Sequence, residues 1–239
     1  SAAPLHAARR EGATMSRLLV LALHGSPGDP QRAHSDFGFL KTPGRNLEFL
    51  LLSDRIATAR EQLLALAERY RGAEISVAPL LLGAGYHYQH DLLPALSALP
   101  GVRLLPRFGR SEAFAHALGR ALCPIEAGQP LHWLVPGGTP VAEDLCDVLS
   151  QAHPVLAAQS QWHLLPRAEL PSVLREAPRG QALLAVLREG RIAQSLRSQW
   201  PGARPLRLLL DLASLQEAVR QWIEAESGAG LIAVESRSS

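Results

Sequence analysis

Two histidines follow apolar runs that end in glycine-rich breaks, and imidazole can both bind a divalent metal and accept a proton near neutral pH. His24 ends the run in LLVLALHGSPGDP, residues 18–30, and His87 follows the run in PLLLGAGYHYQHDLLP, residues 79–94. The neighbouring glycines allow the backbone to approach a ligand closely. If both runs are strands of one parallel sheet, their carboxyl ends lie at one edge. The pattern therefore predicts that the two imidazoles share a site.

Short apolar runs alternate with helical patterns along the chain, which predicts an α/β fold with parallel sheets flanked by helices. The runs are rich in Leu, Val and Ile and do not alternate with polar residues, as expected for strands buried on both faces. In the first half we expect strands at 17–23, 46–52, 74–81 and 101–106. We expect helices at 54–72, 89–99 and 111–122, and a loop with at most a short helix over 26–45.

The same rhythm restarts after a linker at 123–130. In the second half we expect strands at 131–136, 154–158, 181–187 and 204–212. Helices are expected there at 141–152, 167–177, 191–200 and 214–226. The order of elements predicts an internal repeat. The chain therefore divides into an extension (1–15), a first half carrying both histidines (16–123), a degenerate second half (130–227) and a tail (228–239).

Bulk composition excludes several classes of function. The 239 residues are 47% hydrophobic, enough for a substantial core, and the net charge of +2 comes with no basic cluster that would indicate nucleic acid. No apolar run reaches the ~20 residues of a membrane span, and no Walker A or G-x-G-x-x-G motif indicates a nucleotide. Cys123 and Cys146 form no metal or disulfide framework, which favours a reducing cytoplasm. The ESRSS ending leaves room for further domains of a longer chain.

The two histidine motifs together resemble the class II tetrapyrrole chelatases, which include sirohydrochlorin cobaltochelatases and ferrochelatases. The first motif matches at His24, Gly25 and Ser26. The second matches at Pro79, Leu80, Leu81, Leu82, Ala84, Gly85, His87, Asp91 and Pro94. The resemblance extends over residues 17–122 and implies two chelatase-like halves with a cleft between them. It also implies ATP-independent insertion of a metal into a sirohydrochlorin-type tetrapyrrole, a step of cobalamin or sirohaem biosynthesis.

The resemblance implies that His24 and His87 bind the incoming metal and accept the pyrrole protons. The metal would be Co²⁺ or Fe²⁺, and Ni²⁺ also accepts imidazole nitrogen. Arginines would meet the carboxylates of the tetrapyrrole, with Arg107 and Arg110 as candidates. The residues expected along the macrocycle or extending the site are Ser26, Gly85, Tyr86 and His90.

Three departures from the family pattern bear on the metal site. His90 stands where many members carry a glutamate three residues after the second histidine. An acidic residue often ends the second strand, and the nearest ones here are Glu48 and Asp54. The second half has no histidine that corresponds to His87, so we expect a single metal site.

Two other functions compete with metal insertion. In an α/β-hydrolase, GRSEA (109–113) would form a nucleophile elbow around Ser111, with Asp144 or Asp147 as the acid and His163 as the base. Against it, Ala113 replaces the final glycine of the elbow. A metal or tetrapyrrole carrier on the same fold would use the same two histidines without turnover.

Overall fold

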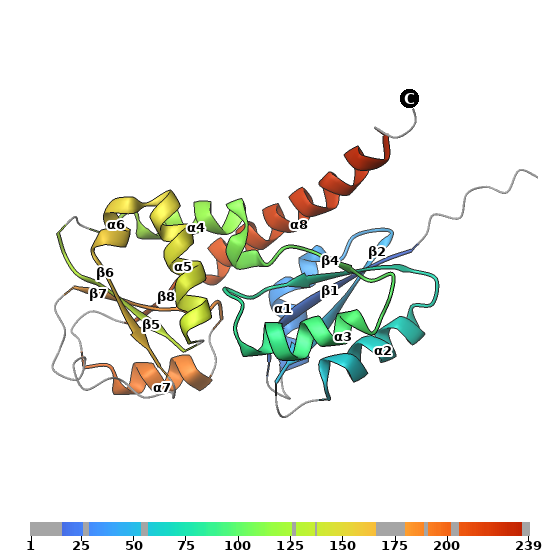
Figure 1. Ribbon diagram of the computed structural model, residues 1–239, viewed down its shortest axis with the longest axis horizontal. Coiled ribbons are helices and arrows are strands. Elements are labelled where there is room, and N and C mark those ends of the chain that lie inside the picture. The colour runs from blue at the N-terminus through green and yellow to red at the C-terminus, as the bar shows by residue number, and fades with distance from the viewer. Residues whose placement is uncertain are drawn as a thin grey trace, which may run out of the picture.

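The computed structural model describes residues 16–25, 29–53, 57–125, 128–136, 138–165, 180–188, 191–201 and 206–235. These residues form two four-stranded sheets with all strands parallel. The strand order is β2-β1-β3-β4 in one sheet and β6-β5-β7-β8 in the other, so the two halves share one topology. The predicted α/β fold class and the internal repeat of element order are confirmed (Figure 1).

The strands lie close to their predicted positions, with one exception. The first sheet contains β1 (Arg17–His24), β2 (Arg45–Leu52), β3 (Glu74–Pro79) and β4 (Arg103–Leu104). The second contains β5 (Leu131–Val135), β6 (Ser160–Leu164), β7 (Gln181–Leu184) and β8 (Arg207–Leu208). The exception is in the second half, where the run at 154–158, predicted as a strand, forms a helix, and β6 lies at a position not predicted as a strand.

Helices follow the strands in each half. In the first half they are α1 (Asp29–Phe37), α2 (Ala59–Arg69), α3 (Leu93–Ser97) and α4 (Glu112–Leu122). In the second half they are α5 (Thr139–Ala152), α6 (Pro154–Ala158), α7 (Arg191–Gln199) and α8 (Leu212–Glu235). Shorter turns are the 3₁₀-helices η1 (Gly38–Leu40) and η3 (Phe108–Arg110) and the π-helix η2 (His87–Leu92). The predicted helix at 167–177 lies outside the described residues.

Alternate residues of the central strands enter different cores. In β1, Leu19, Leu21 and Leu23 face a large core. Residues Leu18, Val20 and Ala22 face the opposite side, which α2 and α3 cover. All six residues are at most 3% exposed, as predicted for a strand buried on both faces.

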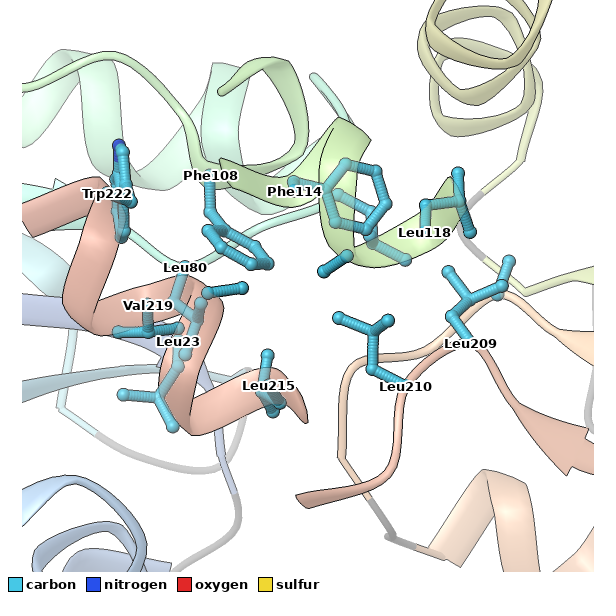
Figure 2. Close-up of a cluster of buried hydrophobic side chains, with 14 of the residues drawn as sticks. Leu23, Leu80, Phe108, Phe114, Leu118, Leu209, Leu210, Leu215, Val219 and Trp222 are labelled. Carbon is cyan, nitrogen blue, oxygen red and sulfur yellow. The ribbon is translucent and has the colours of Figure 1, made fainter. Parts of the chain in front are cut away.

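The large core is shared by the two halves. One face of each sheet contributes to it, together with helices α1, α4, α5 and α8. Figure 2 shows part of this cluster, in which Trp222 and Val219 of α8 lie beside Phe108 and Leu23 of the first half. The second sheet buries its other face against α7. Because the core is continuous, each half loses apolar burial if the other is removed.

The last helix of each half packs against the other half. Helix α4 contacts α5, and α8 contacts α1 and α4. The Arg103 side chain of β4 donates a hydrogen bond to the Glu226 carbonyl of α8 (3.2 Å), and Figure 1 shows α8 passing over the first half. No helix among the described residues is long and apolar enough to cross a membrane.

Candidate functional site

His24 and His87 come together at the carboxyl edge of the first sheet. His24 is the last residue of β1 and pairs in register with Leu52, the last residue of β2. His87 begins the π-helix that follows β3. The centroids of the two imidazole rings lie 5.0 Å apart, with the ring planes at 71°. The juxtaposition expected from the two motifs is therefore present, and both histidines come from the first half.

The helix that carries His87 is widened into a π-helix. The Leu93 amide donates to the Tyr88 carbonyl five residues earlier. Pro94 follows within the same helical run and has no amide hydrogen to donate to His90, which accounts for the departure from α geometry. π-helical turns are rare and occur frequently at functional sites.

Asp91 orients the His87 ring. One of its carboxylate oxygens lies 2.5 Å from His87 Nδ1, and both side chains are partly buried. A carboxylate at that nitrogen favours the tautomer with hydrogen on Nδ1, so the lone pair remains on Nε2. His87 can therefore offer Nε2 to a metal or a proton, and Asp91 would stabilise the imidazolium formed by protonation.

His24 is an exposed residue at the end of β1, so a ligand can reach it. Protein around the ring nevertheless disfavours its charged form. Desolvation is the largest cause, repulsion from His87 adds to it and Asp91 opposes it, and together they lower the pKa of His24 from 6.5 to about 4. His24 is therefore neutral at physiological pH, which is the state that binds metals.

The structure describes three of the four residues expected along the macrocycle, and all three lie close to His87 in the sequence. Tyr86 is 65% exposed, and the centroid of its ring lies 5.6 Å from that of His87 and 4.7 Å from that of His90. His90 is exposed beside Tyr86. The Gly85 carbonyl accepts the amides of the first helical turn, which shows that Gly85 starts the helix. Ser26 lies outside the described residues.

A third protein ligand does not join the pair in the described part of the chain, where no group of three His, Cys, Asp or Glu side chains is suitably placed for a metal ion. Glu48 lies in mid-strand, paired in register with Val20 rather than with His24. Its carboxylate accepts a hydrogen bond from the Tyr70 hydroxyl (2.6 Å). Asp54 lies outside the described residues.

The arginines suggested for substrate carboxylates are instead paired with a carboxylate of the protein. Asp144 of α5 is 5% exposed and accepts hydrogen bonds from Arg107 Nη1 (2.8 Å) and Arg110 Nε (2.8 Å). It also accepts the Ala84 amide (2.8 Å). Burial alone would raise the pKa of Asp144, but the hydrogen bonds from Arg110, Ala84 and Arg107 outweigh it and lower the pKa. Arg107 and Arg110 are thus interface residues, which sequence reasoning missed because the partner lies in the other half.

The hydrolase residues are not arranged as a catalytic triad. The Ser111 hydroxyl caps α4 by accepting the Phe114 amide (3.1 Å) and donates to the Phe108 carbonyl (2.7 Å). His163 is hydrogen-bonded to His132 in the second sheet (3.1 Å), and Asp144 is engaged with the two arginines. Each side chain is held by other partners, as expected for structural roles.

Comparisons with known proteins agree with the fold. No protein-family model and no curated protein matches the sequence. The crystal structure of the sirohydrochlorin chelatase SirB from Bacillus subtilis subspecies spizizenii, in complex with cobalt, superposes with a TM-score of 0.52 and 18% identity. The match covers 89% of this chain and 96% of SirB.

A multi-domain protein from Deinococcus radiodurans, described as structurally similar to chelatases with two additional domains, matches with a TM-score of 0.47 and 17% identity. That match covers 86% of this chain and 54% of the other. At the level of the fold, the SirB superposition confirms the resemblance to the class II chelatases: this protein has a chelatase-like α/β fold made of two similar halves.

Proposed function

We propose that this protein inserts a divalent metal ion, Co²⁺ or Fe²⁺, into a sirohydrochlorin-type tetrapyrrole without ATP. One observation carries the proposal: His24 and His87 lie with ring centroids 5.0 Å apart at the carboxyl edge of a chelatase-like sheet. The cobalt complex of SirB, a protein of the same fold, supports cobalt as the first metal to test.

The two imidazoles are suited to different parts of the reaction. Metal insertion removes two pyrrole protons and replaces water on the metal by macrocycle nitrogens. His24 has a pKa of about 4, so it is a neutral ligand and a weak base. His87, whose Nδ1 is bonded to the Asp91 carboxylate, presents Nε2 as the proton acceptor.

A site to which the described residues contribute two protein ligands suits transfer rather than storage. Co²⁺ and Fe²⁺ bind more than two ligands, so water and then the macrocycle would fill the remaining positions. The exposed Tyr86 ring beside the pair offers a flat apolar surface for a pyrrole, and His90 lies against it. We place the tetrapyrrole beside Tyr86 and the histidine pair.

The test is an assay of metal insertion into sirohydrochlorin, in which the change in the visible spectrum of sirohydrochlorin measures the rate. His24→Ala and His87→Ala should each lower the rate roughly 10²–10⁴-fold, because each removes a ligand or a proton acceptor. His116→Ala, at an exposed histidine of α4, is the matched control and should keep the wild-type rate. Wild-type rates in both site variants would overturn the proposal, and metal binding without insertion in the wild type would identify a carrier.

A further inference from the structure

Two buried carboxylates cross between the halves at corresponding places in the repeat. Among the described residues, Asp36 of α1 and Asp144 of α5 are the only acidic residues that are buried. Helices α1 and α5 are each the first helix of their half, following β1 and β5. Each carboxylate bonds to the segment that follows the third strand of the opposite half. Asp36 accepts Arg188 Nε (3.1 Å) and Nη2 (2.9 Å) after β7, and Asp144 accepts the Ala84 amide after β3.

The segments bound by Asp144 and Asp36 differ in whether a histidine follows. The segment after β3 leads directly into His87, whereas the described segment after β7, which contains Arg188, has no histidine. The second half has therefore kept a contact to the histidine-bearing segment although it has no counterpart of His87. A buried ion pair is weak evidence for stability, because desolvation offsets the attraction. What distinguishes the Asp144 contact is that the segment it binds leads into His87.

Asp144 holds the segment before His87 at more than one point. The Ala84 amide bonds to it directly, and Gly83 packs so closely that a Cβ there would lie 2.7 Å from Val141 Cα and 3.1 Å from Asp144 Oδ2. Arg107, bonded to the same carboxylate, places its guanidinium carbon 4.8 Å from the centre of the Tyr88 ring. One carboxylate of α5 thus contacts the segment before His87 and, through Arg107, the residue after it.

We propose that Asp144 is a positioning residue for the metal site, holding residues 83–88 so that the His87 imidazole stays opposite His24. The inference rests on the proposed function and adds a task for the second half, which has no counterpart of His87. Asp144 touches neither imidazole in this arrangement; it acts through the backbone at Ala84 and through Arg107.

The test compares Asp144→Asn with Asp36→Asn in the full chain. Both replace a buried interface carboxylate by an amide of the same shape, so a role in interface stability alone predicts that neither variant changes cobalt binding selectively. We expect both to lower the melting temperature. Only Asp144→Asn should weaken binding of Co²⁺, measured by its visible absorption without tetrapyrrole, by roughly 10–100-fold. Asp36→Asn should keep the cobalt Kd within about twofold of the wild type.

A second variant avoids an uncompensated buried charge. Gly83→Ala leaves Asp144 and both arginines intact and drives the segment away from α5, so it should weaken cobalt binding like Asp144→Asn. Unchanged cobalt Kd values in both variants, or equal losses in Asp144→Asn and Asp36→Asn, would overturn the inference.

Two further measurements separate this inference from the proposed function. His87→Ala with the wild-type cobalt Kd would overturn the proposed function, since the pair would then not be the metal site. Amide hydrogen exchange of residues 83–88 does not depend on metal chemistry. It should be faster in Asp144→Asn and unchanged in Asp36→Asn, and unchanged exchange in Asp144→Asn would overturn the positioning role by itself.

Discussion

His24 couples the site to the pH dependence of folding. Its pKa is about 4 in the folded protein, against 6.5 for an unperturbed histidine. Between these two values the unfolded chain binds a proton that the folded chain does not. Folding stability attributable to His24 is therefore fully present above about pH 6.5 and is lost as the pH falls toward 4.

Replacing His24 by glutamine should remove this part of the acid sensitivity. We expect His24→Gln to lose less unfolding free energy than the wild type between pH 7 and pH 5, measured by urea denaturation at each pH. His116→Gln, at an exposed histidine, is the control and should follow the wild type. Identical pH slopes for wild type and His24→Gln would show that folding does not perturb the His24 pKa.

At the residue scale, the sequence predicts the histidine pair but not its supporting contacts. His24 and His87 stand out because a strand end and a glycine break mark each of them locally. Asp91 was part of the matched motif, and its bond to His87 follows from helical spacing. The sequence offers Asp144 only as a hydrolase acid, because its bond to Ala84 spans 60 positions and no local pattern encodes it.

At the element scale, the 3₁₀ turn η3 supports the segment that carries His87. The Gly109 amide donates to the Leu81 carbonyl (3.0 Å), and a Cβ on Gly109 would lie 1.9 Å from the Leu82 carbonyl oxygen. Only glycine allows this approach of two backbones. The turn thereby supports Leu82, which immediately precedes Gly83 and its contact with α5.

Gly109→Ala should therefore destabilise the fold by about 2–3 kcal/mol, because the new methyl group must displace backbone. Chemical denaturation measures the loss. Gly38→Ala is the matched control, since a Cβ on Gly38 would meet nothing within 4 Å, and it should change stability by less than about 0.5 kcal/mol. A Gly109→Ala protein as stable as Gly38→Ala would contradict the close approach.

Two errors of element prediction have local physical causes. Residues 154–158 were predicted as a strand because short apolar runs do not distinguish strand from helix. Proline in the first turn and three helix-compatible residues after it produce α6 instead. The neighbouring SQWHL, which is β6, was not predicted because two polar residues and a histidine interrupt its apolar pattern.

At the scale of the whole molecule, α8 ties the two halves into one core. Trp222 of α8 is 1% exposed, and its ring centroid lies 5.4 Å from that of Phe108 in the first half. The Gln216 side chain donates to the Asp36 carbonyl of α1 (2.6 Å). A helix that belongs to the second half by sequence therefore completes the packing of the first half.

Trp222→Ala should destabilise both halves together, by about 3–5 kcal/mol, since it opens a cavity in the shared core. Urea unfolding should remain a single transition, with hydrogen-exchange protection reduced in β1 as well as in β5. Leu212→Ala, at an exposed position of the same helix, should stay within about 0.5 kcal/mol of the wild type. Two separate transitions, or loss of protection in the second half alone, would contradict a shared core.

The sequence by itself determined the α/β alternation, the parallel sheets, the repeat and the two histidines. These features follow from local patterns, namely apolar runs buried on both faces and glycine breaks at strand ends. Only the tertiary structure decided which side chains meet across the halves: Asp144 with Ala84 and Arg107, and α8 with the first half. Such partners depend on how packed faces complement one another at long range, and neither residue spacing nor composition carries that information.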